Sequence, residues 1–272
     1  MLTATRHDDV LELRMSSPRS RLVGYSVAAY RVRDALVDTG FPRVGRRLAR
    51  YLDGAPPLRG AFVTHQHEDH AGNAALLAAR GVPLAMGPGT RAFLERPAPI
   101  ELYRRAIWGS APALPAGAPA FEDEALALLP SPGHSPDHHA VWDAERRTLF
   151  AGDLYLGVKV RIAHPSERPR ETLAAVRRAA ALGPERLFCA HRGAVPTPTA
   201  ALTAKAEWMA ETIGRIEARL AAGWSAAAVR DEVLGREVAT GYVTGGEYAR
   251  INLVRAVRAE SGAAGGGGGA GR

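Results

Sequence analysis

The sequence predicts a layered α/β fold, because short apolar strands alternate with helical segments along most of the chain. The composition agrees with a globular protein. Of the 272 residues, 46% are hydrophobic and 23% are charged, close to the usual mix of about 45–50% and about 25%. At a rough prior of about 150 residues per domain, this length suggests one large domain or a domain with an appendage.

The elements of the first half follow from apolar runs bounded by turn residues. In order, we expect a hairpin at 20–40 around Arg33 and Asp34, a strand at 61–64, a helix at 71–80 and a strand at 82–87. The stretch 95–120 is rich in Pro, Ala and Gly, so it should be a surface excursion with a short helix around Leu102–Trp108. Such a segment often forms one wall of a cleft.

The second half continues the alternation and then becomes helical. The expected elements are strands at 125–130, 139–143, 147–152 and 186–190 and a helix at 170–183. From about 200 onward apolar residues recur every three or four positions, which predicts a long helix ending at Gly223, a helix capped by Ser225, and a last helix at 246–260. We therefore divide the chain into a catalytic domain at 1–198, a helical region at 199–260 and a disordered Gly-rich tail at 261–272.

Compartment and partners follow from what the chain lacks. Asp8, Asp9 and Glu12 stand where a signal peptide needs an apolar core, and no run approaches the roughly 18 apolar residues of a membrane span. We expect a cytoplasmic protein with no membrane partner. The single cysteine, Cys189, is expected to be a buried structural thiol.

The net charge of +7 is spread along the chain as arginine rather than gathered in one basic block. A nucleic-acid partner is therefore not favoured, although it stays open. A small anionic substrate is the preferred partner, and a homodimer is left open.

The segment that decides the chemistry is Thr64-His65-Gln66-His67-Glu68-Asp69-His70, which holds four potential metal ligands between a strand and a helix. Alternation places His65 and His67 on one side of an extended segment. Asp69 and His70 come after the turn and can address a second point. One segment can thus serve two metals.

Three further candidates share a context, because each follows an apolar strand directly. They are His134, Asp153 and His191. If these strands lie side by side in one sheet, their ends meet at one edge, where open α/β sheets build their sites. A set of imidazoles and carboxylates of this kind suits Zn²⁺, with Mn²⁺ or Fe²⁺ as alternatives.

The ordered set HxHxDH, PGHSPDH, AGD and AHRG resembles the metallo-β-lactamase superfamily over residues from about 20 to 195. The resemblance implies a four-layer αβ/βα sandwich, here with a helical C-terminal appendage, and two divalent metal ions. His65, His67 and His134 would hold the first metal, Asp69, His70 and His191 the second, and Asp153 would bridge them. His138 matches a histidine that many members carry and would orient the site, as Thr64 and Asp137 could do.

The implied activity is hydrolysis by a metal-activated water, with Asp69 and Asp153 as the catalytic carboxylates. The short interval between Asp153 and His191 leaves no room for the large inserted domain of the RNA-processing members. The chain looks most like glyoxalase II and related hydrolases, so we expect a small anionic ester or thioester as substrate.

Residues for substrate binding are predicted from the segment after Asp153. Tyr155, Lys159 and Arg161 are placed to line the cleft, and alternation would put the two cations on one face. Tyr248, Arg250 and Asn252 of the last helix could also reach it.

Two rival functions remain open at this point. One is a nuclease or phosphodiesterase of the same fold, which binds nucleic acid through Arg250, Arg255 and Arg258. The other is a metal-binding effector with little turnover, which the complete ligand set disfavours.

Overall fold

The structure is a computed structural model that describes residues 1–265. Contacts within the chain divide it into two compact units, which are described separately. The first unit comprises Met1–Pro130, Asp137–Leu156 and Gly183–Pro198; the second comprises Ser131–Pro136, Gly157–Leu182 and the chain from Thr199 onward. The division groups 131–136 and 157–182 with the C-terminal helices, whereas the boundary drawn from sequence at 198/199 marks only the change to helical composition.

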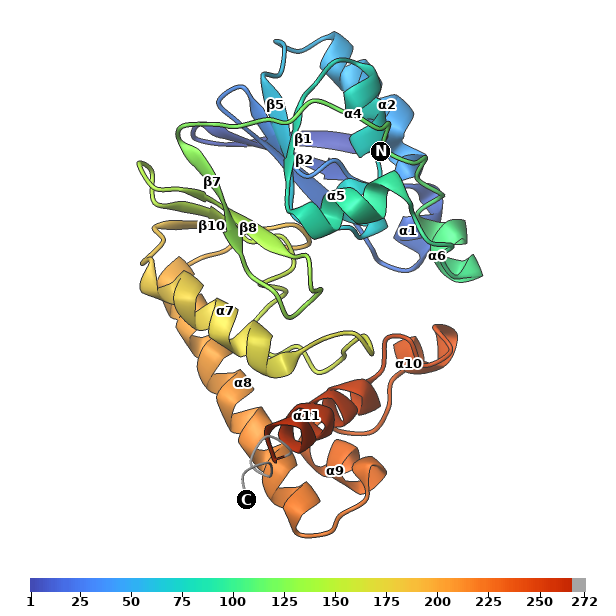
Figure 1. Cartoon of the computed structure of the whole chain (residues 1–272), viewed down its shortest axis with the longest axis vertical. Helices are drawn as coiled ribbons and strands as arrows, with labels where there is room; N and C mark the ends of the chain where they lie inside the picture. Colours follow the sequence, from blue (N-terminus) through green and yellow to red (C-terminus); the bar gives the residue numbers. More distant parts are fainter. Residues whose placement is uncertain (266–272) are drawn as a thin grey trace, which may run out of the picture. The chain divides into compact units, whose positions relative to one another are not determined.

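The first unit contains two β-sheets (Figure 1). The larger sheet has its strands in chain order: β1 (Leu2–His7), β2 (Val10–Met15), β3 (Val27–Val32), β4 (Ala35–Val37), β5 (Gly60–Val63) and β6 (Leu84–Met86). The pairs up to β3 and β4 are antiparallel, while β4–β5 and β5–β6 are parallel. The carboxyl ends of β4 and β5 therefore lie next to each other.

The hairpin expected at 20–40 is present but shorter. β3 and β4 pair across the turn at Arg33, which has a φ of 52°. The stretch before them is not a strand, because α1 (Pro18–Leu22) forms there. Ser17 and Ser20 satisfy each other's backbone N–H groups in a capping box, and Pro18 occupies the first turn, which starts the helix.

The smaller sheet runs in the order β11-β10-β9-β8-β7. Its strands are β7 (Leu126–Pro130), β8 (His139–Asp143), β9 (Thr148–Phe150), β10 (Arg186–Cys189) and β11 (Gly193–Ala194). β9 and β10 are parallel, and the other pairs are antiparallel. The strands predicted at 125–130, 139–143, 147–152 and 186–190 are all found here.

Alternate side chains of the larger sheet enter two different cores. Tyr30 and Phe62 join Val141 and Phe150 of the smaller sheet in a core between the sheets. The opposite face packs under helices, with residues that include Leu13, Ala29, Val63, Val44 and Leu77. These helices are η1 (Pro42–Val44), α2 (Gly45–Asp53), α3 (Glu68–Ala71), α4 (Ala74–Ala79) and α5 (Pro88–Glu95). The helix that follows, α6 (Leu102–Ile107), buries none of its residues.

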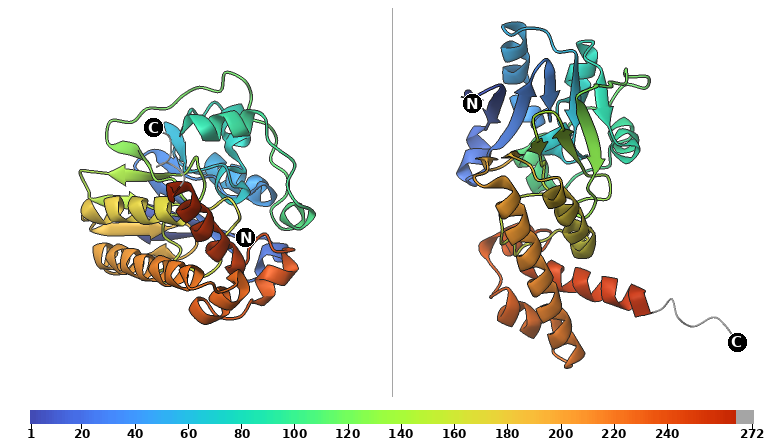
Figure 2. Two further views of the ribbon diagram at one scale, coloured as in Figure 1. Left: turned by 60° about the horizontal axis from the view of Figure 1, so that its bottom comes forward. Right: turned by 90° about the vertical axis from the view of Figure 1, so that its left-hand side faces the viewer.

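The second unit is helical in its described part. It contains α7 (Pro169–Ala181), α8 (Pro198–Ala221), α9 (Ala226–Val233), α10 (Ala239–Val243) and α11 (Arg250–Gly265). α7 and α8 lie side by side (Figure 2), and α11 contacts α7 and α9. Their core includes Ile213, Ile216, Val229 and Val254. As predicted, Ser225 caps α9, accepting a hydrogen bond from the N–H of Ala228 at 3.2 Å.

The last helix differs from the prediction at both ends. It begins at Arg250 rather than 246, and it continues to Gly265, so residues 261–265 are helical although the Gly-rich composition predicts disorder from 261. The Ser261 hydroxyl lies 2.7 Å from Oε1 of Glu217 and 3.0 Å from the carbonyl oxygen of Val257, and donation to Glu217 ties this turn to α8. Residues 266–272 of the predicted tail lie outside the described part. Within residues 1–265, none of the helices has the length and hydropathy needed to span a membrane.

A deletion in the core under the helices should destabilise the protein strongly. Leu77 is fully buried there. We expect Leu77→Ala to lower the free energy of unfolding by about 2–5 kcal/mol, because it leaves a cavity in a packed core. Urea titration followed by circular dichroism measures this.

The matched control is Leu22→Ala, since the side chain of Leu22 is 87% exposed. It should change the free energy of unfolding by less than about 0.5 kcal/mol. Equal losses for the two variants would contradict the assignment of Leu77 to the core.

Candidate metal centre

The parallel strands β4 and β5 set up one edge of the larger sheet. The N–H of Asp38 donates to the carbonyl of Phe62 at 2.8 Å, so the chain just beyond β4 is held against β5. β5 leads directly into Thr64 and His65, and α3 then carries Asp69 and His70. The predicted cluster therefore stands at a strand-to-helix junction.

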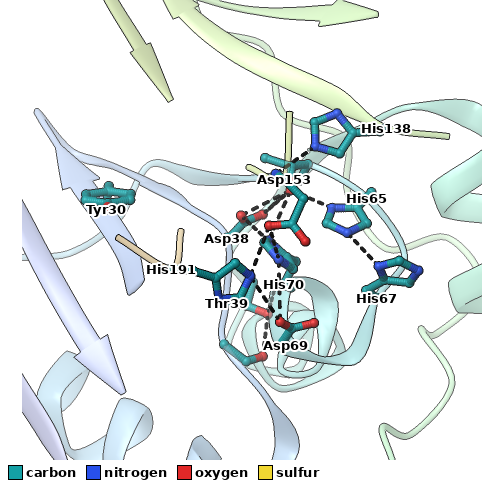
Figure 3. A network of polar contacts seen from close by, with 12 residues as sticks. Tyr30, Asp38, Thr39, His65, His67, Asp69, His70, His138, Asp153 and His191 are labelled. Atoms are coloured by element: carbon teal, nitrogen blue, oxygen red, sulfur yellow. Dashed lines mark hydrogen bonds and ion pairs between the residues drawn. The ribbon is translucent and has the colours of Figure 1, made fainter. Parts of the chain in front are cut away.

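Two groups of potential ligand atoms meet at this edge (Figure 3). Ligand atoms of His65, His67 and Asp153 lie within 4.8 Å of one another, and so do those of Asp69, His70 and His191. Asp153 faces both groups, since its Oδ1 is 3.3 Å from His70 Nε2 and 3.0 Å from His191 Nε2. This places one carboxylate between two clusters, as a bridging ligand requires.

The chemistry of the donors fits cations at this edge. Asp69 and Asp153 are each 7% exposed, so both carboxylates are largely desolvated. Their oxygens face imidazole nitrogens, and the buried Nε2 of His70 has no hydrogen-bond partner within residues 1–265. A divalent metal bound by these nitrogens and oxygens would compensate both groups at once.

Burial and neighbouring charges together shift the pKa of His65 downward and that of His70 upward. Burial lowers the pKa of His65 well below its usual value, and the cationic forms of His70 and His67 lower it further. Burial also lowers the pKa of His70, but the carboxylates of Asp153, Asp69 and Asp38 outweigh this and raise it well above its usual value. The surroundings of His65 thus favour the neutral imidazole, while those of His70 favour the cation.

Asp38 is a residue that the sequence reasoning missed. Its Oδ1 accepts hydrogen bonds from the N–H and hydroxyl of Thr64, both at 2.9 Å, and its Oδ2 is 2.7 Å from Nδ1 of His70. This leaves Nε2 of His70 for the ligand cluster, the arrangement by which carboxylates orient metal-binding histidines. A signal existed: Asp38 directly follows an apolar strand, as the recognised candidates do.

The residues expected to orient the site make contacts that fit such a role. The N–H of Asp153 donates to Nε2 of the buried His138 at 3.0 Å. Asp137 accepts hydrogen bonds from the N–H of Gln66 and the hydroxyl of Thr90, both at 2.8 Å. These bonds link Asp153 and the histidine segment to the two residues directly before β8. An orienting role for His138 stays a prediction.

Tyr25 and Trp108 also lie at the centre and were not foreseen. The Tyr25 hydroxyl donates to Oδ2 of Asp69 at 2.6 Å and lies 3.1 Å from Nε2 of His191. The Tyr25 ring packs on Trp108, with ring centroids 4.4 Å apart. Tyr25 lies just before β3 and Trp108 caps the end of α6, and neither position follows an apolar strand as the recognised candidates do.

The remaining predicted ligand, His134, belongs to the second unit. There its Nδ1 lies 3.6 Å from Oε1 of Glu167. Its place beside His65 and His67 stays a prediction.

The structure lacks the strand on which the prediction of Lys159 and Arg161 as substrate-binding cations relied. Lys159 and Arg161 are exposed and lie in an irregular segment of the second unit, so the expected strand alternation does not exist there. Tyr155 is buried in the first unit. In the second unit, Arg250 donates to the carbonyls of Leu234 and Arg236, and Asn252 is buried with its amide on the carbonyl of Ala163. Those two side chains serve the packing of their own unit.

Cys189 is buried, as expected. Its Sγ accepts weak hydrogen bonds from the N–H groups of His191 at 3.4 Å and Arg192 at 3.3 Å. The thiol therefore supports the turn that presents His191.

The sequence profile of the metallo-beta-lactamase superfamily matches residues 26–191, which include every candidate ligand. The chain belongs to the metallo-beta-lactamase superfamily. A relative with this superfamily's name is the beta-lactamase-like protein 2 homolog of Caenorhabditis elegans, 26% identical over 126 residues. That match covers 45% of this chain and 40% of the relative, so the chain spans less than half the length of the relative it matches.

Solved structures extend the likeness to most of the chain. A metallo-beta-lactamase family protein from Thermus thermophilus is 19% identical, with a TM-score of 0.66 and 94% of each chain covered. A beta-lactamase domain protein from Burkholderia ambifaria is 20% identical, with a TM-score of 0.66, covering 93% of this chain and 88% of the other. A metallo-beta-lactamase from Pontibacter korlensis is 17% identical, with a TM-score of 0.59, covering 77% and 99%. At these identities the likeness shows the fold, and it confirms the predicted superfamily sandwich.

Removing the charge of Asp38 should weaken metal binding. Asn, like Asp, tolerates the left-handed backbone found here, where φ is 62°, so Asp38→Asn changes the charge without adding strain. We expect zinc affinity to fall about 10–100-fold, because His70 loses the carboxylate that orients it. Competition with a chromophoric chelator measures this.

Asp34→Asn is the matched control, because Asp34 is 42% exposed and pairs only loosely with Arg59 at 3.7 Å. Its zinc affinity should equal that of the wild type. If Asp38→Asn also binds zinc normally, Asp38 has no orienting role.

Proposed function

We propose that this protein is a dinuclear metal hydrolase that acts on a small anionic ester or thioester. The observation that carries the proposal is the Asp153 carboxylate, which faces His70 and His191 while its ligand atom also groups with those of His65 and His67. Metal-dependent hydrolases dominate the superfamily to which the chain belongs. The donor set favours Zn²⁺, with Mn²⁺ or Fe²⁺ as alternatives.

Each residue has a defined task in the proposal. His65, His67 and His134 would hold one metal, Asp69, His70 and His191 the other, and Asp153 would contact both. When bound, the two ions supply Lewis acidity and lower the pKa of a water towards neutrality. Asp69 would accept a proton from the attacking water, and the Tyr25 hydroxyl, which donates to Oδ2 of Asp69 at 2.6 Å, would orient that carboxylate.

No side-chain nucleophile is required by this scheme. Burial of the edge around His65, His70 and Asp153 excludes bulk water and strengthens the electrostatic interactions there. A thioester or activated ester is the substrate class proposed, because a metal-activated water can attack its carbonyl directly. The net charge of +7, although spread along the chain, is compatible with an anionic substrate.

The nuclease alternative relies on the last helix, and the described contacts do not favour it. Arg250 already donates to two carbonyls of its own unit, which leaves Arg255 and Arg258 as the exposed cations among the three proposed. Two arginines on one helix form a weak phosphate-binding surface. A steep loss of RNA affinity with rising salt would revive this alternative.

Asp153→Asn tests the dinuclear centre. The amide keeps the shape of the carboxylate but cannot bridge two cations as an anion. We expect metal content after zinc loading to fall from about two ions per chain to one or fewer, and hydrolysis to fall at least about 100-fold. Plasma emission spectrometry of the dialysed protein measures the metal, and a panel of thioesters, lactones, phosphodiesters and a β-lactam measures hydrolysis.

Glu145→Gln is the matched control, because Glu145 is an exposed carboxylate whose ion pair within residues 1–265 is with Arg33 and not with a candidate ligand. It should leave metal content and hydrolysis unchanged. Wild-type levels of both in Asp153→Asn would show that the dinuclear assignment is wrong.

A further inference from the structure

A cavity of about 260 Å³ lies in the first unit, against the reverse side of the histidine segment. Gln66 and Glu68 line it, and in the chain they alternate with His65, His67 and Asp69. Its other walls come from α5 and from the excursion predicted at 95–120. The expectation that this excursion forms the wall of a cleft is met within the first unit.

The cavity is mostly apolar. Ten of its fourteen lining residues carry no polar side-chain group: Ala71, Gly72, Phe93, Leu94, Pro97, Ala98, Pro99, Ile100, Ala111 and Pro112. The prolines and alanines of the stretches 97–99 and 111–112 offer rigid or short walls that do not collapse inward. The volume is just below the about 300–1,000 Å³ typical of pockets for drug-sized ligands, so it suits a short chain or a single ring.

The acid in the cavity wall is already neutralised. Oε2 of Glu68 lies 2.7 Å from Nη2 of Arg104, and the two side chains are 9% and 11% exposed. This buried ion pair has no net charge that a ligand would have to compensate. Glu68 therefore does not repel an anion from the cavity.

Arg105 supplies a cation that is not neutralised. It lines the cavity and is exposed, and within residues 1–265 no carboxylate pairs with its guanidinium. Its backbone is fixed, because its carbonyl accepts a hydrogen bond from Arg43 at 3.1 Å and the N–H of Arg43 donates to the carbonyl of Trp108 at 3.1 Å. A planar guanidinium held at the rim of an apolar cavity suits a carboxylate or phosphate.

We infer that this cavity is a ligand site in its own right, which binds a carboxylate carried on a short apolar chain, with Arg105 contacting the carboxylate and the apolar walls contacting the chain. The inference goes beyond the proposed hydrolase function, and its test does not depend on turnover.

The test measures binding of a carboxylate to the cavity. Hexanoate serves as the probe and hexanol as its uncharged counterpart, each titrated calorimetrically into the zinc-loaded full-length protein. Arg105→Ala should weaken hexanoate about tenfold, the effect of one hydrogen bond to a charged group, and leave hexanol unchanged. Ala111→Phe, which fills the cavity, should abolish binding of both, and Arg46→Ala, a change at an exposed arginine of α2, should affect neither.

Two controls separate the cavity from the metals and from misfolding. Asp153→Asn should still bind hexanoate, since the cavity does not include Asp153. Arg105→Lys keeps the charge and should recover most of the affinity, and each variant should melt within a few degrees of the wild type. Unchanged hexanoate affinity in both Arg105→Ala and Ala111→Phe would overturn the inference, as would loss of hexanoate binding in Asp153→Asn.

Discussion

The arrangement of the centre depends on one buried carboxylate. Asp38 is 2% exposed, and an ion at that depth is tolerated only when its oxygens are fully engaged. Thr64 and His70 engage them, and these two residues flank the histidine segment. The same bonds therefore satisfy the oxygens of Asp38, fix the end of β4 beside the end of β5 and aim His70 at the two aspartates. Loss of the Asp38 carboxylate would therefore disturb both the pairing of the strand ends and the orientation of His70.

The parts that the sequence predicted are those governed by local pattern. Four of the candidate ligands fall within six residues: His65, His67, Asp69 and His70. The pattern of an apolar strand followed directly by a polar ligand also identified Asp153 and His191. Asp38 has the same context but lies beside Thr64 only because β4 and β5 are parallel neighbours. Tyr25 meets Asp69 across 44 positions of sequence, through loops whose path no periodicity determines. Long-range contacts of irregular segments were thus the part beyond reach.

The candidate metal ligands and the residues that line the cavity come from different kinds of segment. The candidate ligands of the first unit come from strand ends and one short helix, where backbone ladders limit movement. The cavity beside them is built largely by a Pro- and Ala-rich excursion, where sequence changes cost little backbone structure. The segment of Lys159 and Arg161 illustrates the difference, because strand alternation was assumed there and the segment is irregular. Residues that bind a ligand in the cavity need not follow the motifs that hold metal.

The packing of Tyr25 on Trp108 has an optical consequence. Trp108 is one of four tryptophans, and its ring lies 4.4 Å from a tyrosine whose hydroxyl contacts Asp69 and His191. Any cation that draws those two side chains together must rearrange the phenol, and with it the surroundings of the indole. The intrinsic fluorescence of Trp108 should therefore respond to a cation bound by Asp69 and His191, and this response needs neither a label nor a chromogenic substrate.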